Sequence, residues 1–255
     1  MEVLMALFLF LKTGERFATQ ETAGPVLSEL TAYVGQRIGA TMEPRVFNEP
    51  ARAVELCARQ KPRAGIVTPG FYLAYRKALG MQPLLEVHRE QVEAERYVLV
   101  ARKTNGTPPT DWTGKTIATT LAAEERYVRG VILQDKLGQE LRLEPVRNVE
   151  DSLFDLVEDA ADAPDAVLVE EAAWKVFVAD PEFDSRLAVV FRSEELPRDL
   201  VVSFSDSPDP ALVTTLRQMS DEEEGRRILR SIRVACFTPV NMERLEHAER
   251  LFHAR

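Results

Sequence analysis

Cysteine and histidine are scarce in this sequence, and their spacing fits neither a metal site nor a redox motif. The 255 residues include two cysteines and three histidines. Cys57 and Cys236 form no C-x-x-C pair, so we expect buried free thiols, with one disulfide between them as the alternative. His88 stands alone, while His247 and His253, six residues apart, face different sides of a helix. We therefore expect no metal site and no cofactor.

An excess of basic residues is also missing. The chain has 41 acidic residues against 32 lysines and arginines, which gives a formal net charge of −9. Nucleic-acid binding requires a basic face, so we expect no nucleic-acid partner. A small charged ligand is not excluded, because a local site can oppose the charge of the whole protein.

Long apolar runs are absent too. The apolar run from Val3 to Leu11 covers nine residues, and a membrane-spanning helix needs about 20. Glu2 precedes it where a signal peptide carries Lys or Arg, and Lys12 follows it in place of a small-residue cleavage site. We expect a buried first strand, with a signal-peptide remnant as the alternative. If the strand is correct, an export signal either lies outside this sequence or never existed.

The motifs of nucleotide and hydrolase chemistry are incomplete. Gly114-Lys115-Thr116 resembles the end of a phosphate-binding loop, but Pro109 stands where that motif requires glycine. No G-x-S-x-G elbow occurs. We therefore expect no catalytic residues, and we expect Gly114 and Lys115 to form a turn and an exposed strand start.

Strand and helix patterns alternate along most of the chain, which is typical of parallel sheets with helical crossovers. Pro25 marks one helix start and Gly39 its end, and Ser220 with Glu223 forms an S-x-x-E capping box. Beyond residue 204 we expect helices alone, the last a charged amphipathic one. The expected strands cover 3–11, 43–47, 64–67, 84–87, 97–101, 115–118, 143–146, 165–169, 187–191 and 200–204. The expected helices cover 25–38, 50–58, 72–79, 123–137, 148–157, 174–177, 210–219 and 241–255, with one more after the capping box, through Ile228, Leu229 and Ile232.

Two pairs of extended runs, within 84–101 and 187–204, divide this pattern into two α/β parts. If both pairs cross between the parts, the chain leaves a first lobe, builds a second and returns. We predict an α/β, two-lobed fold in which each lobe is a mostly parallel sheet flanked by helices and two crossover strands form the hinge. Lobe one would comprise 1–92 and 202–255, and lobe two would comprise 93–201.

Two strand-to-helix turns carry small hydroxyl residues where α/β sheets bind ligands. In the first, a threonine hydroxyl and backbone N–H groups at Thr68 can hold an anion, and Tyr72 offers a ring and a hydroxyl. Helix capping with core packing is the alternative there. The second turn ends in Thr119 and Thr120, and Arg126 follows within two helical turns, where it can pair with an oxyanion or with a surface acid such as Glu124.

Acidic residues follow two other apolar strands. Glu170 and Glu171 come directly after 166–169, and Asp206 comes just after 201–204. Each can accept a hydrogen bond from a ligand amine or hydroxyl. The alternative for the two glutamates is that they favour the dipole at a helix N-terminus.

The order of these segments resembles the type 2 periplasmic solute-binding proteins, in the phosphate/phosphonate branch of ABC transporter receptors. The resemblance covers roughly residues 22–240. It rests on Gly65-Ile66-Val67-Thr68-Pro69-Gly70-Phe71-Tyr72, Trp112-Thr113-Gly114-Lys115-Thr116-Ile117-Ala118, Asp165-Ala166-Val167-Leu168-Val169, Leu196-Pro197-Arg198-Asp199-Leu200-Val201-Val202 and Glu224-Gly225-Arg226-Arg227-Ile228-Leu229.

The resemblance implies a two-lobed receptor that closes over a small polar solute in an interlobe cleft and delivers it to ABC permease subunits. It implies a periplasmic monomer without enzymatic turnover. Thr68, Phe71 and Tyr72 would face the ligand from lobe one. The Thr119–Thr120 turn and Glu170 would face it from lobe two. Binders in this branch usually carry a Ser-Thr-Ser-Gly-like stretch after the second turn, where this chain has Thr119-Thr120-Leu121-Ala122-Ala123-Glu124, so ligand identity stays open.

Two other functions fit the same fold. A ligand-sensing domain of a signalling system would use the C-terminal helix as an interface. A small-molecule enzyme would require a titratable group with a shifted pKa near the ligand, for which the sequence offers Glu170, Glu171 and Asp206 without a partner base. We expect the receptor, because fold-level resemblance favours it.

Overall fold

The computed structural model describes residues 6–13, 19–103, 112–138 and 140–254. They fall into two compact units. Unit 1 comprises Met1–Val92 and Pro197–Leu245, and unit 2 comprises Glu93–Leu196 and Glu246–Arg255. The chain thus passes between the units three times, and the third passage lies within one helix, α10 (Met242–His253). Residues 246–255 therefore belong with unit 2, whereas the sequence assigned them to lobe one.

Unit 1 contains a mixed six-stranded sheet with the order β11-β4-β10-β3-β1-β2. β1 runs parallel to both β2 and β3, whereas β10 pairs antiparallel with β3 and β4, and β11 pairs antiparallel with β4. The sequence did not predict β11. The strands are β1 (Ala6–Leu11), β2 (Met42–Phe47), β3 (Ala64–Val67), β4 (Gln82–Arg89), β10 (Leu200–Ser203) and β11 (Val234–Thr238).

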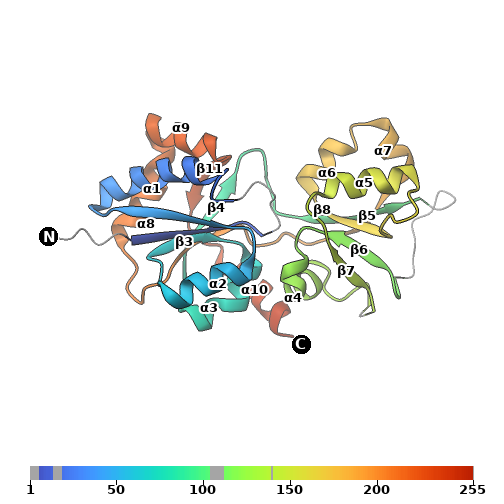
Figure 1. The fold of residues 1–255 in the computed structure, drawn as a ribbon, viewed down its shortest axis with the longest axis horizontal. Coiled ribbons are helices and arrows are strands. Elements are labelled where there is room, and N and C mark those ends of the chain that lie inside the picture. The colour runs from blue at the N-terminus through green and yellow to red at the C-terminus, as the bar shows by residue number, and fades with distance from the viewer. Residues whose placement is uncertain (1–5, 14–18, 104–111, 139, 255) are drawn as a thin grey trace. The chain divides into compact units, whose positions relative to one another are not determined.

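Helices cover both faces of the unit 1 sheet. Figure 1 shows α1 and α9 on one face and α2 and α3 on the other. Prolines in the first turn of α1, α2 and α3 fix the helix starts, and Gly39 and Gly80 end α1 and α3 in the left-handed conformation. The helices are α1 (Gly24–Ile38), α2 (Pro50–Arg59), α3 (Pro69–Leu79), α8 (Pro210–Gln218), the short η3 (Met219–Asp221) and α9 (Glu223–Ser231).

The predicted capping box before α9 is wrong. Ser220 lies inside η3, and the residue that precedes α9 is Glu222, whose side chain makes no capping hydrogen bond. Glu222 is instead engaged by α1, because Tyr33 donates a hydrogen bond to its Oε2 over 2.8 Å. Burial and this hydrogen bond raise the pKa of Tyr33 to about 12.

Unit 2 contains a five-stranded sheet with the order β7-β6-β8-β5-β9. β6 lies parallel to β7 and β8, and β5 pairs antiparallel with β8 and β9. The strands are β5 (Tyr97–Arg102), β6 (Thr116–Thr119), β7 (Arg142–Pro145), β8 (Ala166–Glu170) and β9 (Leu187–Arg192).

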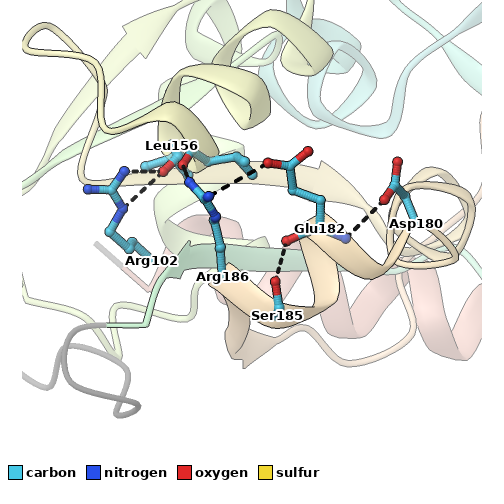
Figure 2. A network of polar contacts seen from close by, with 7 residues as sticks. Arg102, Leu156, Asp180, Glu182, Ser185 and Arg186 are labelled. Atoms are coloured by element: carbon cyan, nitrogen blue, oxygen red, sulfur yellow. Dashed lines mark hydrogen bonds and ion pairs between the residues drawn. The ribbon is translucent and has the colours of Figure 1, made fainter.

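Three helices cover one face of this sheet: α5 (Val149–Glu158), α6 (Glu171–Phe177) and α7 (Pro181–Arg186), while α4 (Glu125–Tyr127) lies on the other (Figure 1). The sequence did not predict α7. Figure 2 shows that Arg102 donates from Nε over 3.0 Å to the carbonyl of Leu156 in the last turn of α5. Arg186 donates to the carbonyl of Val157 over 2.8 Å. Two arginines thus satisfy carbonyls that a helix end leaves without an intrahelical partner.

The long helix predicted over 123–137 is wrong in its extent. The segment contains η1 (Ala122–Glu124), α4 and the π-helical η2 (Val128–Ile132), and it ends where Gln134 and Asp135 adopt positive φ angles. A Cβ on Gly130 would lie 3.2 Å from the carbonyl oxygen of Leu251 in α10, so a larger residue there would have to displace α10 by a few tenths of an ångström. Single-turn π-helices occur where a helix adapts to such local demands.

The Gly114-Lys115 pair is structural, as predicted. Gly114 has a φ of 69°, which forms the turn before β6. Lys115 Nζ lies 2.9 Å from Asp165 Oδ1 at the start of β8, at the edge of the sheet where β6 begins. The two cysteines are free thiols, also as predicted, but only Cys57 is buried, and Cys236 is half-buried. Burial raises the pKa of Cys57 to about 11. None of the helices that the structure describes has the length and apolarity needed to cross a membrane.

Candidate ligand-binding edges of the two sheets

The unit 1 sheet brings six strand ends to one edge. β1, β2, β3 and β4 finish there, and the antiparallel β10 and β11 begin there, since Leu200 lies opposite Val67 and Val234 lies opposite Arg89. Thr68 follows β3 directly and is the N-cap of α3, where its Oγ1 accepts a hydrogen bond from Phe71 N over 3.3 Å. The predicted first turn therefore exists, with its threonine at the carboxyl end of a central strand and at a helix start.

The two aromatic residues of this turn are core residues. Phe71 is 0% exposed and packs on Tyr75 with ring centroids 4.9 Å apart. Tyr72 is 2% exposed, and the Arg76 guanidinium lies 5.8 Å from its ring centroid. For Phe71 this burial supports the packing alternative. For Tyr72, a ligand role would involve the hydroxyl rather than the ring.

A charged pair that the sequence analysis missed lies at the same edge. Lys12 follows β1, Asp199 precedes β10, and Lys12 Nζ lies 3.0 Å from Asp199 Oδ2. Their separation of 187 residues leaves no local signal. Strand order alone brings them together, because β1 and β10 flank β3.

In unit 2, the corresponding edge carries Thr119 and Thr120 at the end of β6. Thr119 is fully buried, and its Oγ1 accepts a hydrogen bond from Leu121 N over 3.2 Å. Thr120 is half-buried. A short helical turn at 122–124 follows them instead of a regular helix. The second predicted turn is therefore a strand end with two hydroxyl groups.

Both glutamates after β8 lie at this edge too, each with a partner. Tyr97 lies opposite Glu170 in the β5–β8 pairing, and its hydroxyl donates to Glu170 Oε1 over 3.3 Å. Glu171 opens α6, and its Oε1 lies 2.7 Å from Arg192 Nε. The unit 2 edge thus combines threonine hydroxyls with two acids, one held by a phenol and one by a guanidinium.

Arg126 lies beside the C-terminal helix. Its Nε donates to the carbonyl of Phe252 over 2.9 Å, and its guanidinium lies 4.6 Å from the centroid of the Phe252 ring. A cation at this position also complements the negative end of the α10 dipole. The structure thus gives Arg126 a packing role in unit 2.

Asp206 does not lie with Thr68. β10 runs antiparallel to β3, so Ser203 pairs with Ala64 at the amino end of β3. Asp206 follows β10 and therefore lies at the opposite edge of the unit 1 sheet, where Gln82 Nε2 is 3.5 Å from its carbonyl. The direction of β10, which the local sequence pattern does not reveal, thus places Asp206 and Thr68 at opposite edges of the unit 1 sheet.

Among the residues that the structure describes, no group of three or more His, Cys, Asp and Glu side chains is arranged to hold a metal ion. The two edges carry hydroxyl and carboxylate groups, together with an ammonium group in unit 1 and a guanidinium group in unit 2. Such groups bind a polar organic solute or an oxyanion through hydrogen bonds and charge pairing.

Solved structures show the same fold. The protein XAC2383 from Xanthomonas citri, bound to chloride, aligns with a TM-score of 0.76 and 16% identity over 98% of each chain. A binding-protein component of an ABC phosphonate transporter from Pseudomonas aeruginosa aligns with a TM-score of 0.65 and 11% identity, over 97% of this chain and 85% of that one. PhnD1 from Prochlorococcus marinus, in complex with methylphosphonate, gives a TM-score of 0.63 and 10% identity over 97% and 96%. These likenesses confirm the two-lobed α/β fold of type 2 periplasmic binding proteins.

The family follows from the sequence. Residues 18–245 match the family model of the phosphonate-type periplasmic substrate-binding proteins of ABC transporters. The chain therefore belongs to this family, as its resemblance predicted. No curated protein sequence matches it. The family is one of transporter substrate-binding proteins and not a class of enzymes.

Proposed function

We propose that this chain binds a small phosphonate- or phosphate-like oxyanion and delivers it to an ABC permease. The observation that carries the proposal is the threonine turn found in each unit, at Thr68 and at Thr119, in a member of the phosphonate-binding family. Both turns lie at the carboxyl ends of parallel strands, where α/β sheets bind ligands. PhnD1, a structural neighbour, is in complex with methylphosphonate, which supports the same ligand class here.

Each unit offers its own candidate ligand groups. Thr68 and the Tyr72 hydroxyl supply hydrogen-bonding groups from the unit 1 edge. Thr119 and Thr120 supply hydroxyls from the unit 2 edge, where Glu170 accepts a hydrogen bond from an amine or hydroxyl of the ligand. The protein acts as a monomer in the periplasm, it does not turn over its ligand, and its macromolecular partner is the permease.

A thermal-shift screen tests the ligand class. The panel holds phosphate, phosphite, methylphosphonate, an aminoalkylphosphonate, sulfonates, amino acids and polyamines. A ligand at 100 times its Kd stabilises the folded state by about 2.7 kcal/mol, which raises Tm by several degrees in a chain of this size. We expect the shift with the phosphorus oxyanions. A shift with amino acids or polyamines alone would contradict the oxyanion class, and a flat screen would favour a sensing domain or an enzyme.

Matched threonine variants then locate the site. Thr68→Val and Thr119→Val each remove one hydroxyl from an edge, whereas Thr215→Val removes a buried hydroxyl from α8, a helix that packs against α1 and β11. We expect the first two to raise the Kd of the oxyanion about tenfold, the size of a charged hydrogen bond. The Thr215 variant should leave it unchanged. Equal Kd values for all three variants would show that the oxyanion binds away from Thr68 and Thr119.

A further inference from the structure

We propose that Lys12 is a ligand-binding residue at the unit 1 edge and that Asp199 neutralises its ammonium group when no ligand is bound. This inference rests on the proposed function, because it takes that edge as an oxyanion site. It adds to the threonine turn the positive charge that an oxyanion favours.

The backbone of each residue is fixed by strand pairing. Lys12 N donates to the carbonyl of Phe47 over 3.1 Å, which continues the β1–β2 ladder. Val87 N donates to the carbonyl of Asp199 over 2.9 Å, which holds that residue against β4. The ion pair is therefore not needed to set the register of either strand, so its presence calls for another explanation.

Strand register places the pair around Thr68. Phe10 lies opposite Ile66 in the parallel β1–β3 pairing, so Lys12, two residues on, lies beside Thr68. Leu200 lies opposite Val67 in the β10–β3 pairing, so Asp199 lies beside Thr68 on the other side. The ammonium and the carboxylate therefore meet across the end of β3, where α3 begins.

The environment of the pair suits ligand exchange. The Lys12 and Asp199 side chains are 20% and 17% exposed, so both charges are largely removed from water but accessible to a small solute. An unpaired charge in such a place is costly, and Asp199 offsets that cost when no ligand is bound. An ammonium group carries three donors, so a ligand oxyanion can share it with Asp199.

Substitution of Lys12 should therefore weaken ligand binding, whereas substitution of Asp199 should not. Lys12→Met keeps the aliphatic stem and removes the charge, and it should raise the Kd of methylphosphonate more than tenfold. Asp199→Asn removes the competing negative charge, and it should leave that Kd unchanged or lower it up to about fivefold. Lys12→Arg keeps the charge and should weaken binding less than Lys12→Met. Isothermal titration calorimetry with methylphosphonate measures all four Kd values.

If the Lys12–Asp199 ion pair only stabilises the packing of β1 and β10, a different result is expected. In that case Lys12→Met and Asp199→Asn would lower Tm alike, and their Kd values would equal that of the wild type or rise together; either result overturns the proposal. If Lys12→Met does not fold, a raised Kd in Asp199→Asn is sufficient to overturn it. Failure of the wild-type protein to bind any phosphorus oxyanion in the thermal-shift screen would instead overturn the proposed function, and this inference with it.

Discussion

The threonine turns of the two units have the same topology, but the charged groups beside them differ. In both units a buried strand ends at a threonine whose hydroxyl accepts a nearby backbone N–H, at Thr68 and at Thr119. The unit 1 edge adds a lysine held by an aspartate. The unit 2 edge adds Glu170, held by the Tyr97 hydroxyl, and Glu171, paired with Arg192. The shared part is what the fold provides, and under the proposed function the charged part selects the ligand.

The two strands that precede these turns also differ in how closely they approach a neighbouring strand. This difference gives the largest expected effect on the free energy of unfolding. A Cβ on Gly65 in β3 would lie 2.5 Å from the carbonyl oxygen of Leu9. Gly65→Ala must therefore push β3 away from β1, and we expect the free energy of unfolding to fall by about 3 kcal/mol. Urea denaturation measures this.

The matched variant in unit 2 is Ala118→Gly, which removes a fully buried methyl group from β6. It should cost about 1–2 kcal/mol through backbone entropy and lost burial. If Gly65→Ala costs no more than Ala118→Gly, the close approach of β3 to β1 does not constrain the unit 1 turn.

The acids of unit 2 should discriminate among ligands. Glu170→Gln keeps the shape of the side chain and removes its charge. We expect it to reduce the preference for an aminoalkylphosphonate over methylphosphonate about tenfold, or about 1.4 kcal/mol, since a charged hydrogen bond to the amine is lost. Calorimetric Kd values for the two ligands give the ratio.

Glu171→Gln is the matched control. Its carboxylate is paired with Arg192, and its side chain is 12% exposed, so the substitution should lower stability and leave the ligand ratio unchanged. An unchanged ratio in Glu170→Gln would remove Glu170 from the binding site.

The helix after the unit 2 turn is held by α10, and α10 begins in unit 1. Arg126→Ala removes the bond to the Phe252 carbonyl and the contact with its ring. Because Arg126 is exposed, we expect a loss of about 1 kcal/mol in unfolding free energy and less than a twofold change in ligand Kd. A tenfold rise in Kd without a loss of stability would return Arg126 to the ligand site predicted from the sequence.

A double-mutant cycle isolates that contact. Phe252→Leu removes the ring but keeps the backbone carbonyl. Combined with Arg126→Ala, it should show a coupling energy of about 0.5–1 kcal/mol from the cation–π contact. Coupling near zero would mean that the ring contributes packing alone.

Local patterns predicted the elements and both turns, because prolines, glycines and apolar runs act within a few residues. They predicted α1 from Pro25 and Gly39, and the β3–α3 turn from the residues around Thr68. They failed where strand order or direction decides the outcome. Lys12 and Asp199 meet only because β1 and β10 flank β3. Asp206 lies at the opposite edge from Thr68 because β10 is antiparallel to β3. β11 and α7 are short, so their patterns are weak. β11 also follows a helical segment, so the sequence pattern there was interpreted as helix throughout.

The free energy of unfolding of the two units should also depend differently on pH. This is the smallest of the expected effects. In unit 1, burial and then the charges of Arg198 and Arg244 lower the pKa of His88. As pH falls through about 6.5, the unfolded chain therefore takes up a proton that folded His88 does not, and stability decreases until the folded pKa is reached. In unit 2, burial would raise the pKa of Asp165, but hydrogen bonds from Thr116 N and Lys115 outweigh it and the pKa is lowered.

Asp165 therefore contributes stability above its unfolded pKa of about 3.9, and that stability is lost only as pH falls below about 4. Between pH 7.5 and 5.5 unit 1 should lose stability, by less than about 1 kcal/mol, while unit 2 keeps its own. Both tryptophans, Trp112 and Trp174, belong to unit 2, so fluorescence-detected urea unfolding follows unit 2 and circular dichroism follows the whole chain. His88→Gln should flatten the circular-dichroism profile in this range. An equal decrease in the fluorescence midpoint would show that the units unfold together, and an unchanged profile in His88→Gln would assign the pH dependence to other groups.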